Sequence, residues 1–130
     1  VSIVSEGVFD QFPELRVALL ESGCTWLPTF MWRFDKEWRN LRRLVPWVKQ
    51  APSAYIRERI RVTIQPFDAP ATPRHLPHIV DQIGSDEMLL FSSDYPHVHD
   101  SVAERPILDD LPEALAQKIR SENARAFYRL

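Results

Sequence analysis

The pattern of apolar and polar residues predicts helices that alternate with short strands. The most regular stretch is residues 26–45, where apolar side chains recur every three or four positions opposite a basic face. That spacing is typical of an amphipathic helix, which Pro46 would end. Shorter helices are predicted at 5–12, 52–58, 75–83 and 121–128, and one more that Asp109 or Asp110 would cap, with Pro112 near its first turn.

Three apolar runs between these helices predict strands, at residues 15–21, 59–66 and 87–92. The first is continuous and suggests a strand buried on both faces, whereas in the second Ile60, Val62 and Ile64 alternate with polar side chains. Strands separated by helices favour a parallel sheet with right-handed crossovers, so the predicted fold class is α/β. A sheet of three strands has two open edges, and we expect further strands to pair with them.

Composition narrows the class of protein. The chain has 130 residues, 45% of them hydrophobic, enough for one packed domain. Its net charge of −2 gives no basic excess, so we expect no nucleic-acid partner. Apolar runs are far shorter than the roughly 20 residues of a membrane span, so we expect no membrane partner. The single cysteine, Cys24, excludes a disulfide framework and fits a cytoplasmic location.

Polar side chains follow each predicted strand: Glu21 and Ser22, then Gln65, then Ser92, Ser93 and Asp94. Functional groups of parallel α/β folds gather at the carboxyl ends of the strands, so these residues predict an active-site rim. Asp94 could bind a metal ion or take a proton from a bound water, and the alternative is a solvated loop or N-cap aspartate.

Four other residues are candidates near this rim. Glu21 could act as a general base or accept a hydrogen bond from substrate, or it could form a salt bridge with an arginine. Trp26 could form the wall of a pocket, and Gln65 and His97 are candidate substrate contacts. His97 and His99 could bind a metal together with Asp94, although histidines are also common in solvated loops.

Four segments together resemble the C-terminal half of the amidohydrolase-related family. This is the group of metal-dependent hydrolases and decarboxylases that includes aminocarboxymuconate semialdehyde decarboxylase. Residues 7–17 and 21–28 carry part of the resemblance. The more specific motifs are Phe91-Ser92-Ser93-Asp94-Tyr95-Pro96-His97 and Glu122-Asn123-Ala124-Arg125-Ala126-Phe127-Tyr128.

The resemblance implies a (β/α)8 barrel of about 250 residues or more, of which residues 1–130 would be one C-terminal segment holding the last three β/α units. It implies that Asp94 is a metal ligand that also handles the proton of the attacking water, with zinc as the expected metal. The family's remaining ligands, a first-strand His-x-His pair and a fifth-strand histidine, are absent from this chain, and His97-Val98-His99 does not replace them. The metal site of this chain would therefore be incomplete.

Three functions stay open at this point. The resemblance favours hydrolysis of a small organic substrate by a metal-activated water. Decarboxylation is the less favoured alternative, because several decarboxylase branches have a histidine at the position where this chain has Glu21. The third possibility is a non-catalytic half-barrel, stabilised by forming a homo-oligomer or by association with the missing N-terminal half.

Overall fold

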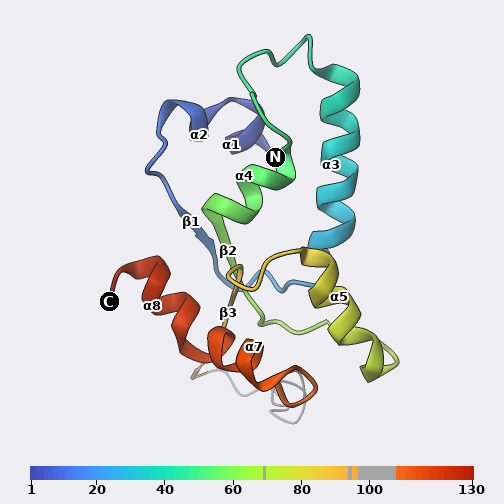
Figure 1. Ribbon diagram of the computed structural model, residues 1–130, viewed down its shortest axis with the longest axis vertical. Helices are drawn as coiled ribbons and strands as arrows, with labels where there is room; N and C mark the ends of the chain where they lie inside the picture. The colour runs from blue at the N-terminus through green and yellow to red at the C-terminus, as the bar shows by residue number, and fades with distance from the viewer. Residues whose placement is uncertain (69, 94, 97–107) are drawn as a thin grey trace.

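Three parallel strands form the centre of the molecule (Figure 1). The computed structural model describes residues 1–68, 70–93, 95–96 and 108–130. The strands are β1 (Val17–Leu19), β2 (Ile60–Thr63) and β3 (Leu89–Leu90), in the order β1-β2-β3. Val62 lies opposite both Leu19 and Leu89. The carboxyl ends of all three strands therefore meet at one edge of the sheet, as the sequence predicts.

Helices precede, connect and follow the strands. Their bounds are α1 (Ser2–Ser5), α2 (Val8–Gln11), α3 (Leu27–Leu41), α4 (Pro52–Arg59), α5 (Leu76–Ile83), α7 (Glu113–Gln117) and α8 (Asn123–Tyr128). The structure confirms the three predicted helices between the strands, α3, α4 and α5. Gly84 ends α5 in a left-handed conformation with φ 70°, which glycine adopts without steric cost.

Both ends of the chain differ from the prediction. The helix predicted at 5–12 is two short helices, because Gly7 between them has φ 71°. Pro112, not Asp109 or Asp110, is the residue that precedes α7. A π-helical turn (Lys118–Glu122) joins α7 directly to α8, since no glycine or proline interrupts residues 113–128.

Burial also differs between the strands. β1 is only half-buried, because it is an edge strand of the described sheet, so the prediction of burial on both faces is wrong for it. β2 is central and all four of its residues are buried, including Arg61. Its polar residues Arg61 and Thr63 therefore lie inside the protein.

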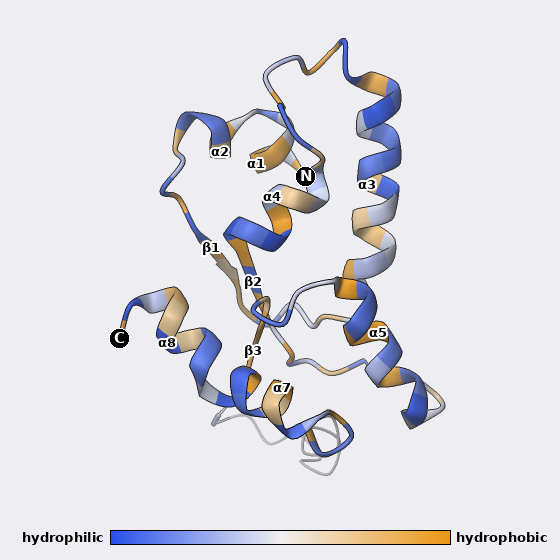
Figure 2. Ribbon diagram, viewed as in Figure 1, coloured by the Kyte–Doolittle hydropathy of each residue, from blue (hydrophilic) through white to orange (hydrophobic). Residues whose placement is uncertain are grey.

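The hydrophobic core lies between the sheet and the helices. It includes Val62 and Ile64 of the central strand segment, Met31 of α3, Ile83 of α5 and Ile119 of the π-helical turn. Figure 2 shows hydrophobic positions in orange along the strands. The C-terminal half of α3 carries mainly hydrophilic positions, drawn in blue. No helix within the described residues is long and apolar enough to cross a membrane.

Candidate active site

An open hollow of about 460 Å³ lies where the strands end. Residues at or just after the ends of all three strands line it: Leu20, Glu21, Thr63, Gln65, Phe91, Ser92, Ser93 and Tyr95. Glu21, Gln65, Ser92 and Ser93 are thus brought together as the sequence predicts. We call this hollow the rim hollow.

Backbone contacts hold the ends of β1 and β2 together beneath the rim hollow. The Gln65 carbonyl accepts hydrogen bonds from the Gly23 amide, at 3.3 Å, and from the Thr63 hydroxyl, at 3.1 Å. Thr63, the last residue of β2, and Gln65, two residues later, both line the rim hollow. Gln65 is only 4% exposed, so its place at the rim is fixed by packing.

Glu21 is exposed at the rim, which corrects the expectation that it ends a buried strand. The edge position of β1 explains this exposure. Glu21 has φ 52°, a left-handed conformation that costs a non-glycine residue roughly 1–2 kcal/mol. Among the described residues it forms no ion pair with an arginine, so the salt-bridge alternative is not what the structure shows. Its carboxylate faces solvent at the rim and is available to a ligand.

Trp26 does not line the rim hollow. Its indole Nε1 donates a hydrogen bond to the Ser22 carbonyl, at 2.8 Å. The ring also meets Phe30 edge-on, with 5.3 Å between the ring centroids. These contacts fix the loop that carries Glu21 and Ser22, so Trp26 acts on the rim through that loop.

Cys24 lies beside the same loop but is not a reactive thiol. Burial, with a smaller contribution from the negative charge of Asp68, raises its pKa to about 12. A thiol with this pKa remains protonated at neutral pH, and the protonated form is a poor nucleophile.

Part of the predicted site lies outside the described residues: Asp94, His97 and His99. Within the described ranges, no three His, Cys, Asp or Glu side chains cluster as a metal would require. The rim hollow supplies one described carboxylate, Glu21, whereas a catalytic zinc site typically has three protein ligands. The described residues alone therefore do not fit a complete metal site.

Thr63, Leu20, Phe91 and Tyr95 also line the rim hollow and were not predicted as site residues. For Thr63 a signal existed, since it is two residues before Gln65 on the same face of the predicted strand. Leu20 and Phe91 belong to apolar runs that indicated core strands, and nothing in those runs marks the residue at which the strand becomes exposed.

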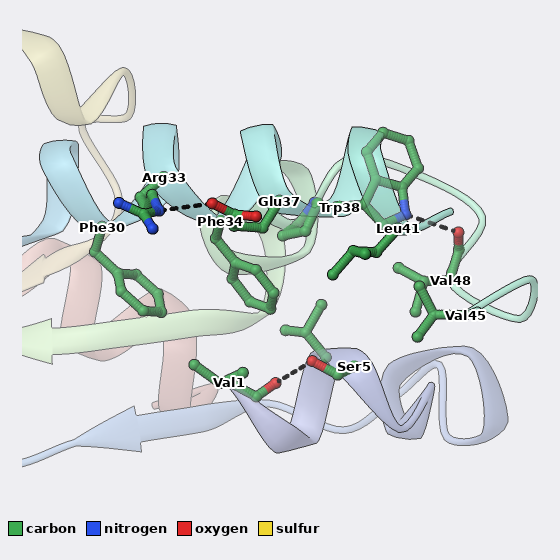
Figure 3. Close-up of a pocket in the computed structure, with 12 residues that line it drawn as sticks. Val1, Ser5, Phe30, Arg33, Phe34, Glu37, Trp38, Leu41, Val45 and Val48 are labelled. Atoms are coloured by element: carbon green, nitrogen blue, oxygen red, sulfur yellow. Dashed lines mark hydrogen bonds and ion pairs between the residues drawn. The ribbon is translucent and has the colours of Figure 1, made fainter. Parts of the chain in front are cut away.

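A second hollow, of about 320 Å³, lies between α1, α3 and the segment after α3 (Figure 3). Its walls are mostly apolar side chains, among them Phe30, Phe34 and Leu41. The charged side chains in its lining, Arg33 and Glu37, pair with each other at 2.8 Å. The Ser5 hydroxyl in its lining donates a hydrogen bond to the Val1 carbonyl, at 3.2 Å, and no described base forms a hydrogen bond with it. We therefore place the chemistry at the rim hollow.

Solved structures with the same fold include several decarboxylases. The chain is 24% identical to 5-carboxyvanillate decarboxylase from Sphingomonas paucimobilis, with a TM-score of 0.77. It is 25% identical to 2,6-dihydroxybenzoate decarboxylase from Rhizobium, with a TM-score of 0.71. It is also 25% identical to a dihydroxybenzoic acid decarboxylase from Polaromonas sp. JS666, with bound manganese and the inhibitor 2-nitroresorcinol, with a TM-score of 0.66.

In each case the match covers 98% of this chain but 38% of the other chain. The three-stranded sheet and its helices thus correspond to part of an amidohydrolase barrel. A search of the curated proteins gives no match. The profile of the amidohydrolase family, by contrast, matches residues 2–130. The chain therefore belongs to the amidohydrolase family.

Proposed function

We propose that this chain forms the last three β/α units of a metal-dependent amidohydrolase-type barrel and supplies part of its active site. The observation that carries the proposal is the rim hollow, where polar side chains from all three strand ends meet. In barrels of this class the chemistry takes place at the carboxyl ends of the strands. We expect the open edges of β1 and β3 to pair with further strands, from elsewhere in the protein or from a second copy.

We assign catalytic roles to Asp94 and Glu21, and substrate contacts to Gln65 and His97. Asp94 is the proposed metal ligand, on its match to the family motif. The metal that we propose is a divalent ion, and the manganese bound in the Polaromonas relative supports this choice. The other ligands of the ion would lie outside the described residues. Trp26 is a positioning residue, because its bond to the Ser22 carbonyl holds the loop of Glu21.

The reaction we propose first is decarboxylation of a small aromatic acid. Similarity over 98% of this chain to decarboxylases of dihydroxybenzoic acids supports it. The reaction breaks the bond between ring and carboxyl carbon, releases carbon dioxide and places a proton on the ring carbon. A carboxylic acid at the rim, Asp94 or Glu21, would carry that proton.

The rim hollow has the side chains that such a substrate needs. Leu20, Phe91 and Tyr95 supply apolar surface for a ring, while Gln65 and the hydroxyls of Ser92 and Ser93 can form hydrogen bonds with its substituents. Gln65 is buried and held through its backbone, so it can orient a ligand without first becoming ordered itself.

Hydrolysis is the second candidate, and Glu21 is the observation that favours it. A carboxylate at this rim can take a proton from an attacking water. The side chain is exposed and its carboxylate pairs with no cation among the described residues, so it is free to do so.

One assay distinguishes the two reactions. The longest product of the gene is loaded with Mn²⁺ or Zn²⁺ and given 2,6-dihydroxybenzoate, 5-carboxyvanillate, or simple esters and amides. Carbon dioxide release identifies a decarboxylase, and acid release from the esters or amides identifies a hydrolase.

Substitutions then test the roles at the rim. We expect Asp94→Asn and Glu21→Gln each to lower kcat/KM by about a hundredfold or more, the usual size of a general acid–base effect. Glu14→Gln changes an exposed carboxylate that precedes β1, at the opposite end of that strand from the rim hollow. It is the matched control and should stay within about twofold. Full activity in both rim variants would refute the assignment, as would the absence of either reaction with either metal.

A further inference from the structure

We propose that Thr63 is a specificity-determining residue of the rim hollow, and that its hydroxyl oxygen accepts a hydrogen bond from a hydroxyl group of the substrate. The proposal rests on the function proposed above, because it takes the rim hollow as the substrate site. It adds the class of substrate, which is a ring that carries a hydrogen-bond donor at the position facing the end of β2.

The hydroxyl proton of Thr63 is already committed. Thr63 Oγ1 lies 3.1 Å from the Gln65 carbonyl oxygen. A carbonyl has no proton, so the hydroxyl is the donor in this bond, and a threonine hydroxyl has one proton to give. Within the described residues, no group donates a hydrogen bond to Thr63 Oγ1. A ligand that reaches this oxygen must therefore donate to it.

The Thr63 hydroxyl cannot turn its proton toward a ligand without cost. Its acceptor, the Gln65 carbonyl, is held in place by a second donor, the Gly23 amide, at 3.3 Å. The bond from Thr63 is buried, and a buried carbonyl that loses a donor is destabilised. The direction of the Thr63 hydrogen bond is thus fixed by the backbone around it.

Thr63 lies in the most buried part of the rim hollow. It is 3% exposed, whereas Leu20 and Phe91, which line the hollow from the ends of β1 and β3, are 66% and 46% exposed. β2 lies between the other two strands. A ring that packs against Leu20 or Phe91 therefore presents its substituents to the end of the central strand.

This arrangement does not depend on the edges of the sheet. β2 is paired with β1 on one side and with β3 on the other, so further strands of a barrel would join at the outer edges. The bond from Thr63 to Gln65 lies within the central segment. Occupation of the rim hollow by another part of the barrel is an outcome of the test below.

Substituents that only accept hydrogen bonds are disfavoured at Thr63. An ether oxygen or a fluorine would bring lone pairs against the lone pairs of Oγ1 and would remove this oxygen from water without a donor. A site that hydrogen-bonds a substrate hydroxyl rejects analogues that lack it, because its own polar group is then left unpaired. Thr63 therefore selects hydroxyl-bearing rings.

Binding of two matched ring compounds tests the proposal. Resorcinol, the product that decarboxylation of 2,6-dihydroxybenzoate would give, carries two hydroxyls. 1,3-Difluorobenzene has fluorine at the same two positions and cannot donate. The Kd of each compound is measured by NMR titration of the longest product of the gene, loaded with Zn²⁺, and the readout is the ratio of the two Kd values.

We expect the wild-type protein to bind resorcinol at least about fivefold more tightly, the usual size of one neutral hydrogen bond. Thr63→Val keeps the shape of the side chain but has no oxygen, so it should reduce this preference by about fivefold. Thr63→Ser restores the hydroxyl and should retain most of it. Thr29→Val, the same change on α3 away from the lining of the rim hollow, should leave the ratio unchanged.

The ratio separates recognition from a merely structural role. If Thr63 only held the Gln65 carbonyl, Thr63→Val would weaken both compounds equally, and an unchanged ratio would overturn the proposal. Equal affinity of the wild-type protein for the two compounds would also overturn it, and this measurement needs no variant. So would the absence of resorcinol binding, which would show that another part of the barrel fills the hollow.

The outcome for Thr63 can be told apart from the outcome for the reaction. Carbon dioxide release from 2,6-dihydroxybenzoate, together with equal Kd values, would refute the role of Thr63 and leave the decarboxylase assignment intact. A preference that depends on Thr63 in a protein that catalyses neither reaction would refute the assigned reactions and support the selective hollow.

Discussion

At the scale of single residues, Gly23 is what allows the ends of β1 and β2 to meet. Its φ is +61°, and a Cβ built on it would lie 2.7 Å from the Pro66 carbonyl oxygen. Because that oxygen belongs to the backbone, it cannot rotate away as a side chain could. The sequence shows a glycine after the strand, but the approach of Pro66 is long-range and has no local signal.

We therefore predict that Gly23→Ala lowers the free energy of unfolding by about 2 kcal/mol or more, through the positive φ and the close contact together. Urea denaturation measures this. Gly84→Ala is the control: its φ is +70°, but its Cβ would meet only the flexible Arg57 side chain, at 3.2 Å, so about 1 kcal/mol is expected. Equal losses would show that the contact with Pro66 is unimportant.

Cys24 gives the stability of the protein a defined dependence on pH. Its folded-state pKa is about 12, against an ordinary value of 9.0. A group whose folded pKa is raised contributes stability that is complete below the unfolded pKa and is lost as pH rises toward the folded pKa. The contribution of Cys24 is thus complete below pH 9 and falls between pH 9 and 12.

Cys24→Ala isolates this effect, because alanine does not titrate. At pH 7 the variant should be less stable by about 1 kcal/mol, from the lost sulfur packing. By pH 10 the difference should shrink by about 1 kcal/mol, because the unfolded wild-type chain has begun to ionise. A stability difference that stays constant from pH 7 to pH 10 would contradict the raised pKa.

At the scale of elements, Asn123 fastens the C-terminal helix to the sheet. It is buried, and its Nδ2 donates hydrogen bonds to the carbonyls of Asp86, at 2.8 Å, and Leu89, at 3.0 Å. Lys118 and Asp86 add an exposed ion pair at 2.6 Å. The amide group thus explains in physical terms why an asparagine occupies this place in the closing-helix motif.

Replacing Asn123 by alanine removes both donors and leaves two backbone carbonyls without this partner. We expect a loss of about 2 kcal/mol or more in unfolding free energy, measured by thermal or urea denaturation. Arg125→Ala, an exposed change two residues later, should cost less than about 0.5 kcal/mol. A loss no larger than that of Arg125→Ala would show that the two bonds do not anchor the helix.

Helices with strong periodicity were predictable, whereas strand burial was not. The stripe along α3 and the stop at Gly84 are local signals, so both elements were placed from sequence. The half-burial of β1 and the full burial of Arg61 depend on which strand is central, and strand order is a property of the whole sheet. The break at Gly7 was missed because a single glycine is also tolerated inside a helix, so the sequence alone does not mark it as a break.

At the scale of the whole molecule, the convergence of the strand ends was predictable and the details of the site were not. Parallel strands place Glu21, Gln65 and Ser92 at one edge by topology alone. Trp26 was expected to form a pocket wall, but its indole donates a hydrogen bond to the Ser22 carbonyl instead. That contact depends on the geometry of the loop, which has no local signal in the sequence. Asp94, His97 and His99 lie outside the described residues, and their assignment stays a prediction.

The proposed function requires that a divalent ion and the substrate bind where the three strands end. Broadening of backbone amide NMR signals by added Mn²⁺ tests this most directly, since the effect reports proximity to the ion residue by residue. We predict that Glu21, Gln65, Ser92 and Ser93 broaden first and that Glu21→Gln weakens the effect. Broadening that instead starts at the acidic surface around Asp109, Asp110 and Glu113 would contradict the claim.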